Sequence, residues 1–185
     1  MTLARVMALV CWVAGSILAQ AAEDAPSGRV QFPVPDEGPV TAELITQHAS
    51  IQPGGQTRIG VHFELEEGWH IYAKEPGDAG LPTTVSWWAP SGTLVGAVEW
   101  PPAEEFLDPG DIRTYGYQGT TVLSSLFGVN RGMAAGITVP IRAEVSWLAC
   151  KEICIPGSAT LELSLPVTKD PPAFSTHAQL FEQTS

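Results

Sequence analysis

The sequence predicts an all-β fold, either a sandwich or a barrel. Residues 59–65 alternate strictly, with Ile59, Val61, Phe63 and Leu65 separated by polar or small residues. Turn-forming groups of proline, glycine, serine and aspartate separate such stretches at 53–55, 76–78, 90–92 and 109–111. No long amphipathic helical pattern is visible, so a thioredoxin fold is not expected. Several short strands at this spacing are typical of all-β sandwiches and barrels.

The N-terminal residues predict export. Arg5 precedes an apolar run over 6–18 that is too short to span a membrane comfortably. Ala19-Gln20-Ala21 is a small-x-small cleavage site, so 1–21 is interpreted as a signal peptide, and Cys11 would leave with it. The alternative is a short membrane anchor that stays attached. We expect a flexible leader over 22–38, one folded domain over 39–168 and a polar tail over 169–185 with a short terminal helix.

The charge balance excludes two classes of partner. The chain has 9 Lys and Arg against 20 Asp and Glu, a formal net charge of −11. It contains no basic patch, so nucleic acid and anionic lipid are poor partners. The acidity favours solubility and would steer the protein toward a basic partner surface.

Further strands are expected along the chain at 83–88 and 93–100. Trp87, Trp88, Trp100 and Trp147 are interpreted as core residues, whereas His62 is assigned to a solvated face because it alternates with the apolar set.

The last two strands predict a hairpin in a specific register. Residues 137–147 and 159–167 both alternate, and a turn over 151–153 would place Cys150 opposite Cys154. Without a turn, the Cα atoms of the two cysteines would lie about 13 Å apart, beyond disulfide reach. This register aligns one apolar face by pairing Val145 with Ala159, Ala143 with Leu161, Ile141 with Leu163, Val139 with Leu165 and Ile137 with Val167. It also pairs Arg142 with Glu162 on the outer face, where the parity of the strands places both cysteines. Pro156 and Gly157 are expected to distort the ladder near the turn.

The spacing of the two cysteines favours a working dithiol. A disulfide that closes a five-residue loop stabilises the fold by only about 2 kcal/mol in the chain-entropy account. A short loop also makes such a bond easier to reduce. Lys151 and Glu152 have opposite effects on a neighbouring thiolate, so little net activation is expected from them.

Several motifs resemble one known family. They are Gly68-Trp69-His70-Ile71-Tyr72, Pro76-Gly77-Asp78-Ala79-Gly80-Leu81-Pro82-Thr83, Tyr115-Gly116-Tyr117-Gln118-Gly119, and the run from Val145 through Cys150 and Cys154 to Gly157. In this order they resemble the N-terminal periplasmic domain of the thiol:disulfide interchange protein DsbD and its ScsB-like relatives. The likeness covers roughly residues 40–167.

The resemblance implies an immunoglobulin-like sandwich in the periplasm with a redox-active pair, Cys150 and Cys154. It implies that Cys154 attacks the client disulfide and Cys150 resolves the mixed disulfide. An aromatic cap would lie around Thr114, Tyr115, Gly116 and Tyr117, with His70 and Tyr72 beside the site. Electrons would come from a membrane-embedded thiol reductant, a DsbD- or ScsB-like transmembrane domain. They would pass to thioredoxin-like or disulfide-containing periplasmic clients, including those of cytochrome c maturation.

Two features depart from the family pattern. The enterobacterial form spaces its cysteines further apart. Full-length members continue into a transmembrane domain, so this chain is either a separate subunit or a fragment.

Other interpretations of the cysteine pair remain open. It could be a structural disulfide in a non-catalytic binding or scaffold module. The loop also resembles the dinuclear copper site of cytochrome oxidase subunit two, but Ser158 stands where that site needs a histidine. Zinc would need two further ligands. No metal or other cofactor is expected.

His70 is either a thiolate-tuning residue or an ordinary strand histidine. For Tyr72, Tyr115 and Tyr117 the alternative is core packing, and a functional role is favoured for Tyr115 and Tyr117 because glycine-flanked loop aromatics are harder to bury.

Overall fold

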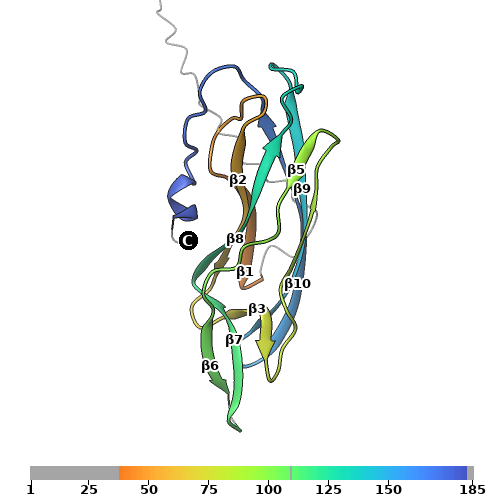
Figure 1. Ribbon diagram of the computed structural model, residues 1–185. Coiled ribbons are helices and arrows are strands. Elements are labelled where there is room, and N and C mark those ends of the chain that lie inside the picture. Colours follow the sequence, from red (N-terminus) through yellow and green to blue (C-terminus); the bar gives the residue numbers. More distant parts are fainter. Residues whose placement is uncertain (1–37, 109, 183–185) are drawn as a thin grey trace, which may run out of the picture.

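Ten strands form two antiparallel sheets in a computed structural model that describes residues 38–108 and 110–182 (Figure 1). The first sheet has the order β1-β2-β8-β5. Its strands are β1 (Val40–Thr46), β2 (Gln56–Leu65), β8 (Thr120–Val129) and β5 (Thr93–Val95). The second has the order β10-β9-β3-β7-β6, and β4 pairs with β9 outside this path. Its strands are β3 (His70–Gly77), β4 (Thr84–Trp88), β6 (Glu104–Asp108), β7 (Ile112–Gln118), β9 (Thr138–Cys150) and β10 (Cys154–Pro166). The architecture confirms the predicted immunoglobulin-like β-sandwich.

The predicted signal peptide over 1–21, and the predicted leader as far as residue 37, lie outside the described residues. No helix within the described part of the chain has the length and apolar character needed to cross a bilayer.

The hydrophobic core lies between the two sheets. The alternating set predicted on β2 faces inward, and Phe63 meets the indole of Trp147 edge to face, with ring centroids 5.6 Å apart. The fully buried side chains Leu44, Ile59, Val61, Leu123 and Phe127 come from the first sheet, and Ile71, Ile141, Ala143 and Leu165 from the second. Burial of this apolar set is the main force that holds the two sheets together.

Strand β9 connects the core to the cysteine pair. One of its edges pairs with β10 over the whole length of both strands. Two strands share the other edge of β9. β4 pairs with Arg142–Ser146, and β3 pairs with Ala149 and Cys150. Because β3 reaches only the last two residues of β9, it delivers His70 and Tyr72 to the end of the strand that carries Cys150.

The β9–β10 hairpin has the predicted register. Cys150 lies opposite Cys154, and the pairs Val145–Ala159, Ala143–Leu161, Ile141–Leu163 and Val139–Leu165 follow in order. Two details differ from expectation. The ladder continues without a register shift through Pro156 and Gly157, because Gly157 lets the strand pass directly against the indole of Trp147, where a Cβ would lie 2.4 Å away. Arg142 and Glu162 are opposed as predicted, but the Arg142 guanidinium bonds the carboxylate of Glu144.

The chain changes sheets between β7 and β8. Gly119 has a φ of +66° and accepts a hydrogen bond from the N–H of Leu65. Glycine adopts this conformation without steric cost. Gly119 alone therefore connects β7, in the sheet that carries the cysteine pair, to β8 in the opposite sheet.

The segment after Val167, predicted as a polar tail, folds over the outer face of the first sheet. It contains a short 3₁₀ helix, η1 (Ala178–Phe181). The ring of Phe181 is fully buried with Ile45 and Val122, which forms a second, smaller apolar cluster. His62 lies on this covered face and is only 7% exposed, so its assignment to a solvated face is wrong. The predicted alternation placed His62 on the correct face, but distant residues cover that face.

The tryptophan and strand predictions are correct only in part. Trp147 is buried, and Trp87 and Trp100 pack against the core, whereas Trp88 is 55% exposed. The side chains of Trp87 and Trp88 point to opposite faces of β4, so only one can face inward. The strand expected over 93–100 ends at Val95, and Glu99 makes an isolated bridge to Ser124.

Candidate functional site

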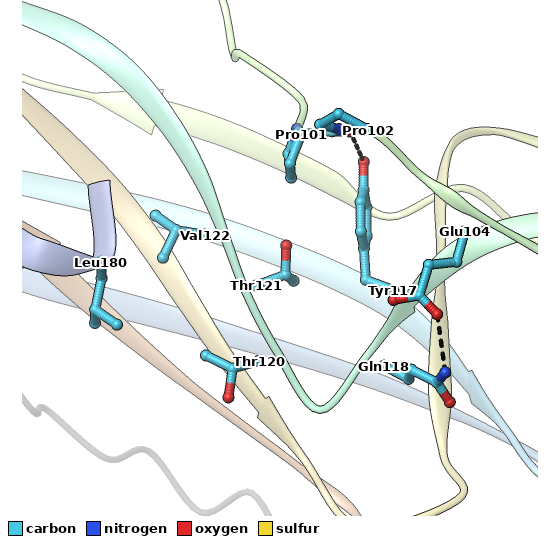
Figure 2. A pocket seen from close by; sticks show the side chains of 9 residues that line it. All are labelled: Pro101, Pro102, Glu104, Tyr117, Gln118, Thr120, Thr121, Val122 and Leu180. Atoms are coloured by element: carbon cyan, nitrogen blue, oxygen red, sulfur yellow. Dashed lines mark hydrogen bonds between the residues drawn. The ribbon is translucent and has the colours of Figure 1, made fainter. Parts of the chain in front are cut away.

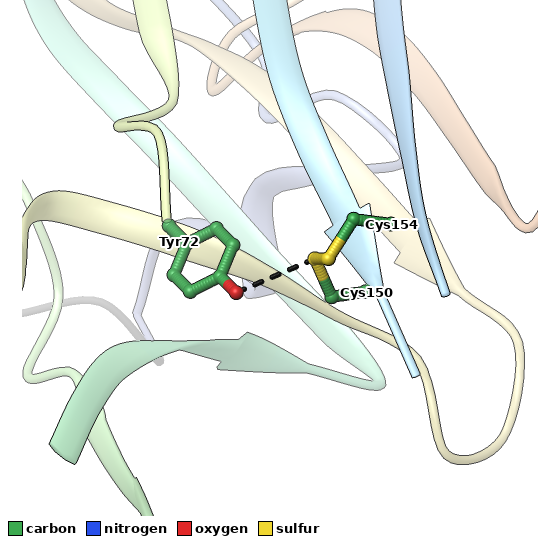
Figure 3. The surroundings of a disulfide bond; sticks show 3 residues. All are labelled: Tyr72, Cys150 and Cys154. Atoms are coloured by element: carbon green, nitrogen blue, oxygen red, sulfur yellow. Dashed lines mark hydrogen bonds between the residues drawn. A yellow bond between two sulfur atoms is a disulfide. The ribbon is translucent and has the colours of Figure 1, made fainter. Parts of the chain in front are cut away.

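The end of the β9–β10 hairpin holds a disulfide between Cys150 and Cys154 (Figure 3). The two residues face each other in the register of the ladder, and the N–H of Lys151 bonds the carbonyl of Ile153 to close the turn. Cys150 is 3% exposed, whereas Cys154 is exposed to solvent. One cysteine of the disulfide is therefore exposed and the other is shielded.

Tyr72 contacts the shielded sulfur directly. Its hydroxyl donates a hydrogen bond to Sγ of Cys150 at 3.3 Å, and Figure 3 shows the ring beside the disulfide. The loop after β3 holds this ring in place. Gly80 has a φ of +96°, and a Cβ on it would lie 2.4 Å from Cε1 of Tyr72. Only a residue without a side chain allows the backbone to lie this close to the tyrosine ring.

Two aromatic rings contact His70, which precedes Tyr72 on β3 by two residues. His70 is the register partner of Cys150 and is buried. The ring of Phe106 stacks on the His70 imidazole at a centroid distance of 4.6 Å, and Tyr72 meets the same imidazole edge to face at 5.2 Å. Phe106, on strand β6, was not among the sequence-predicted site residues. The sequence offered one indication of this site residue: Phe106 is a single aromatic residue that follows two glutamates.

The predicted cap residues form strand β7 rather than a loop. Thr114 is fully buried and lies opposite both Phe106 and Gly77. Gly116 lies opposite Tyr72, and its missing side chain leaves room for the Ile71 carbonyl, to which a Cβ would lie 2.1 Å away. Tyr115 is 36% exposed, and its hydroxyl contacts Glu105 Oε2 at 3.5 Å. These three residues support the β6–β7 hairpin that carries Phe106.

Tyr117 belongs to the core, which corrects the expectation that it would be hard to bury. It is 5% exposed, its hydroxyl donates to the Pro101 carbonyl at 2.9 Å, and burial raises its pKa to about 12. Tyr117 lines a pocket with a volume of about 180 Å³. Figure 2 shows the side chains around it. The pocket is also lined by Pro101, Pro102, Glu104, Gln118, Thr120, Thr121, Val122 and Leu180. Gly116, beside Tyr117, lets β7 pack closely against β3 and so favours burial of the ring.

The described residues offer no ready metal centre at the cysteines. No group of three or more His, Cys, Asp or Glu side chains in 38–108 and 110–182 is placed to hold a metal ion. Ser158, at the position where the copper-type loop needs a histidine, lies opposite Ser146. The residues around the disulfide therefore do not fit the donor set that copper or zinc requires.

The geometry suits disulfide exchange at one sulfur. A thiolate can approach Sγ of Cys154 from the exposed side of the disulfide, and the sulfur that leaves is then that of Cys150. The Tyr72 hydroxyl is already directed at this sulfur and would stabilise the thiolate that forms there.

The sequence matches the model of a known family. Residues 39–166 match the family described as "Thiol:disulfide interchange protein DsbD, N-terminal". The chain belongs to this family. No curated protein sequence matches the chain at a significant level.

One solved structure shares the fold. The N-terminal periplasmic domain of ScsB from Proteus mirabilis superposes with a TM-score of 0.57 at 20% identity. The match covers 82% of this chain and 56% of that one, so this chain spans about half the length of the ScsB domain. The reduced DsbD N-terminal domain of Neisseria meningitidis has a TM-score of 0.32 at 15% identity, covering 72% of this chain and 90% of that one.

Proposed function

We propose that this DsbD N-terminal domain works in the periplasm and passes electrons from a membrane-embedded thiol reductant to oxidised client proteins. The observation that carries the proposal is the unequal exposure of the two cysteines, with Cys154 open to solvent and Cys150 buried beside Tyr72.

Each cysteine has its own role in the exchange. In the reduced protein, the Cys154 thiolate attacks one sulfur of the client disulfide, and the other client sulfur leaves as a thiolate. The Cys150 thiolate then attacks Sγ of Cys154 in the mixed disulfide, which releases the second client thiol and restores the Cys150–Cys154 bond. The client gains two electrons, and the domain becomes oxidised until the membrane reductant attacks Cys154 in turn.

The hairpin itself argues against a purely structural disulfide. The ladder between β9 and β10 runs without interruption from Cys150–Cys154 to Thr138–Pro166. A bond that closes the end of an already continuous hairpin restricts the unfolded chain over a short loop only. We therefore expect reduction to lower stability modestly and to leave the fold intact.

Single-cysteine variants test the assignment of roles. The Cys150→Ser variant keeps the attacking thiol and lacks the resolving one, so it should accumulate reductant-sensitive mixed disulfides with proteins of a periplasmic extract. The Cys154→Ser variant should trap few, because Cys150 is buried beneath Tyr72 and beside His70.

The outcomes separate the parts of the proposal. Equal trapping by both variants would contradict the assignment of roles but leave the exchange function standing. Trapping by neither variant, with both folded by circular dichroism, would contradict the exchange function and favour a scaffold module.

A further inference from the structure

The exposed end of the hairpin presents an apolar side chain beside carboxylates. Ile153 lies between the two cysteines and is 65% exposed, and the adjacent Glu152 is exposed as well. The turn before β3 lies against this loop, because Nζ of Lys151 donates to the Glu67 carbonyl at 3.0 Å. This contact places the exposed residues Glu66 and Glu67 next to the loop that carries the disulfide.

The basic side chains near this end of the hairpin do not neutralise all of the carboxylates there. Lys151 and Glu152 balance each other, and Lys74 is followed directly by Glu75. Arg113 pairs with Glu105 at 2.8 Å. The carboxylates of Glu66 and Glu67, together with Glu104 and Asp78 on the neighbouring segments, have no basic side chain within ion-pair distance among the described residues.

We infer that the partners that exchange disulfides at Cys154 present a basic surface, with an apolar contact for Ile153, around their own reactive sulfur. This inference rests on the proposed exchange function and adds which partners that function selects. Opposite charges around two reacting sulfurs raise the rate of encounter, and like charges lower it. The attraction acts before any covalent step, so it selects among partners whose disulfides are otherwise equally reactive.

Small disulfides of opposite charge test the inference without an identified partner. The reduced protein is mixed with cystamine, which carries two ammonium groups, or with 3,3′-dithiodipropionate, which carries two carboxylates. In each case the two protein thiols become the Cys150–Cys154 disulfide, and the probe becomes two thiols. Each rate constant is divided by that of dithiothreitol with the same probe, which removes the intrinsic reactivity of the probe.

We expect the normalised rate for cystamine to exceed that for the dianion by about tenfold at low salt. The preference should shrink to about twofold or less in 1 M salt, where the screening length is about 3 Å. The double variant Glu66→Gln with Glu67→Gln, which removes the two unbalanced carboxylates next to the disulfide loop, should lose most of the preference. Glu162→Gln, which removes a carboxylate from the same outer face far along β10, should keep it.

Two negative results are distinguishable. Exchange with both probes at equal normalised rates, or a preference that salt does not reduce, would overturn the inference and leave the exchange function intact. Failure to reduce either probe would contradict the exchange function itself.

Discussion

At the residue scale, one hydrogen bond distinguishes the two sulfurs. The Tyr72 hydroxyl reaches Sγ of Cys150 at 3.3 Å, while Cys154 is open to solvent. A hydrogen bond to a charged group contributes about 1.5–3 kcal/mol. In the reduced protein this bond favours the thiolate of Cys150, the form that resolves a mixed disulfide.

Replacing Tyr72 with phenylalanine tests this contact. In a Cys154→Ser background, where Cys150 is the sole thiol near the site, Tyr72→Phe should raise the pKa of Cys150, because its thiolate loses a hydrogen-bond donor. The measurement is the pH dependence of the alkylation rate of Cys150. Tyr115→Phe is the matched control, because the Tyr115 hydroxyl contacts Glu105 and not a cysteine. An identical Cys150 titration with and without the Tyr72 hydroxyl would contradict the role given to it.

At the scale of elements, β3 and the loop after it assemble the site on the end of β9. Sequence patterns predicted the β9–β10 register because both strands are long, and a slip of one residue would expose every apolar side chain. The same patterns could not predict that β3 and β4 share the other edge of β9, since those pairings depend on tertiary contacts. The contact of Phe106 with His70 is also a tertiary contact, so the sequence did not predict Phe106 as a site residue. Tyr117 was predicted as a cap residue, although β7 buries it.

Alanine at Gly80 measures how strongly the loop holds Tyr72. Gly80 and Gly136 both have positive φ, at +96° and +91°, but a Cβ at Gly136 would meet no atom within 4 Å. Both variants therefore suffer the backbone cost of about 1 kcal/mol, and only Gly80→Ala must also displace the Tyr72 ring. We expect Gly80→Ala to destabilise the fold by about 1–3 kcal/mol more than Gly136→Ala in urea unfolding. Equal losses of stability would show that the loop does not clamp the ring.

At the scale of the whole molecule, the C-terminal segment covers the outer face of the first sheet and buries a second set of apolar side chains there. Phe181 of η1 covers Ile45 and Val122, and His62 on the same face becomes buried. Burial lowers the pKa of His62 below its ordinary value of 6.5, and the charge of His177 acts in the same direction, whereas Glu64 and Glu43 oppose it. No pattern local to β2 could have predicted this, because the covering residues lie more than a hundred positions later.

The buried His62 predicts that the domain loses stability in acid. Because the folded-state pKa is lowered, the unfolded chain takes up a proton first as pH falls below 6.5, and stability decreases from that pH downward. The contribution between pH 7.5 and 5.5 is at most about 1.4 kcal/mol, and His62→Gln should remove it. Urea unfolding of both proteins at the two pH values gives the difference. The same pH dependence in both would contradict the burial account.

The reduction potential of the Cys150–Cys154 pair tests the central claim most directly. It is measured by equilibrating the domain with glutathione or dithiothreitol buffers and counting alkylated thiols. An exchange module should lie within the range of known disulfide oxidoreductases, about −270 to −120 mV, and should stay folded when reduced. A potential below about −300 mV, together with loss of the fold on reduction, would instead identify a structural disulfide and contradict the account.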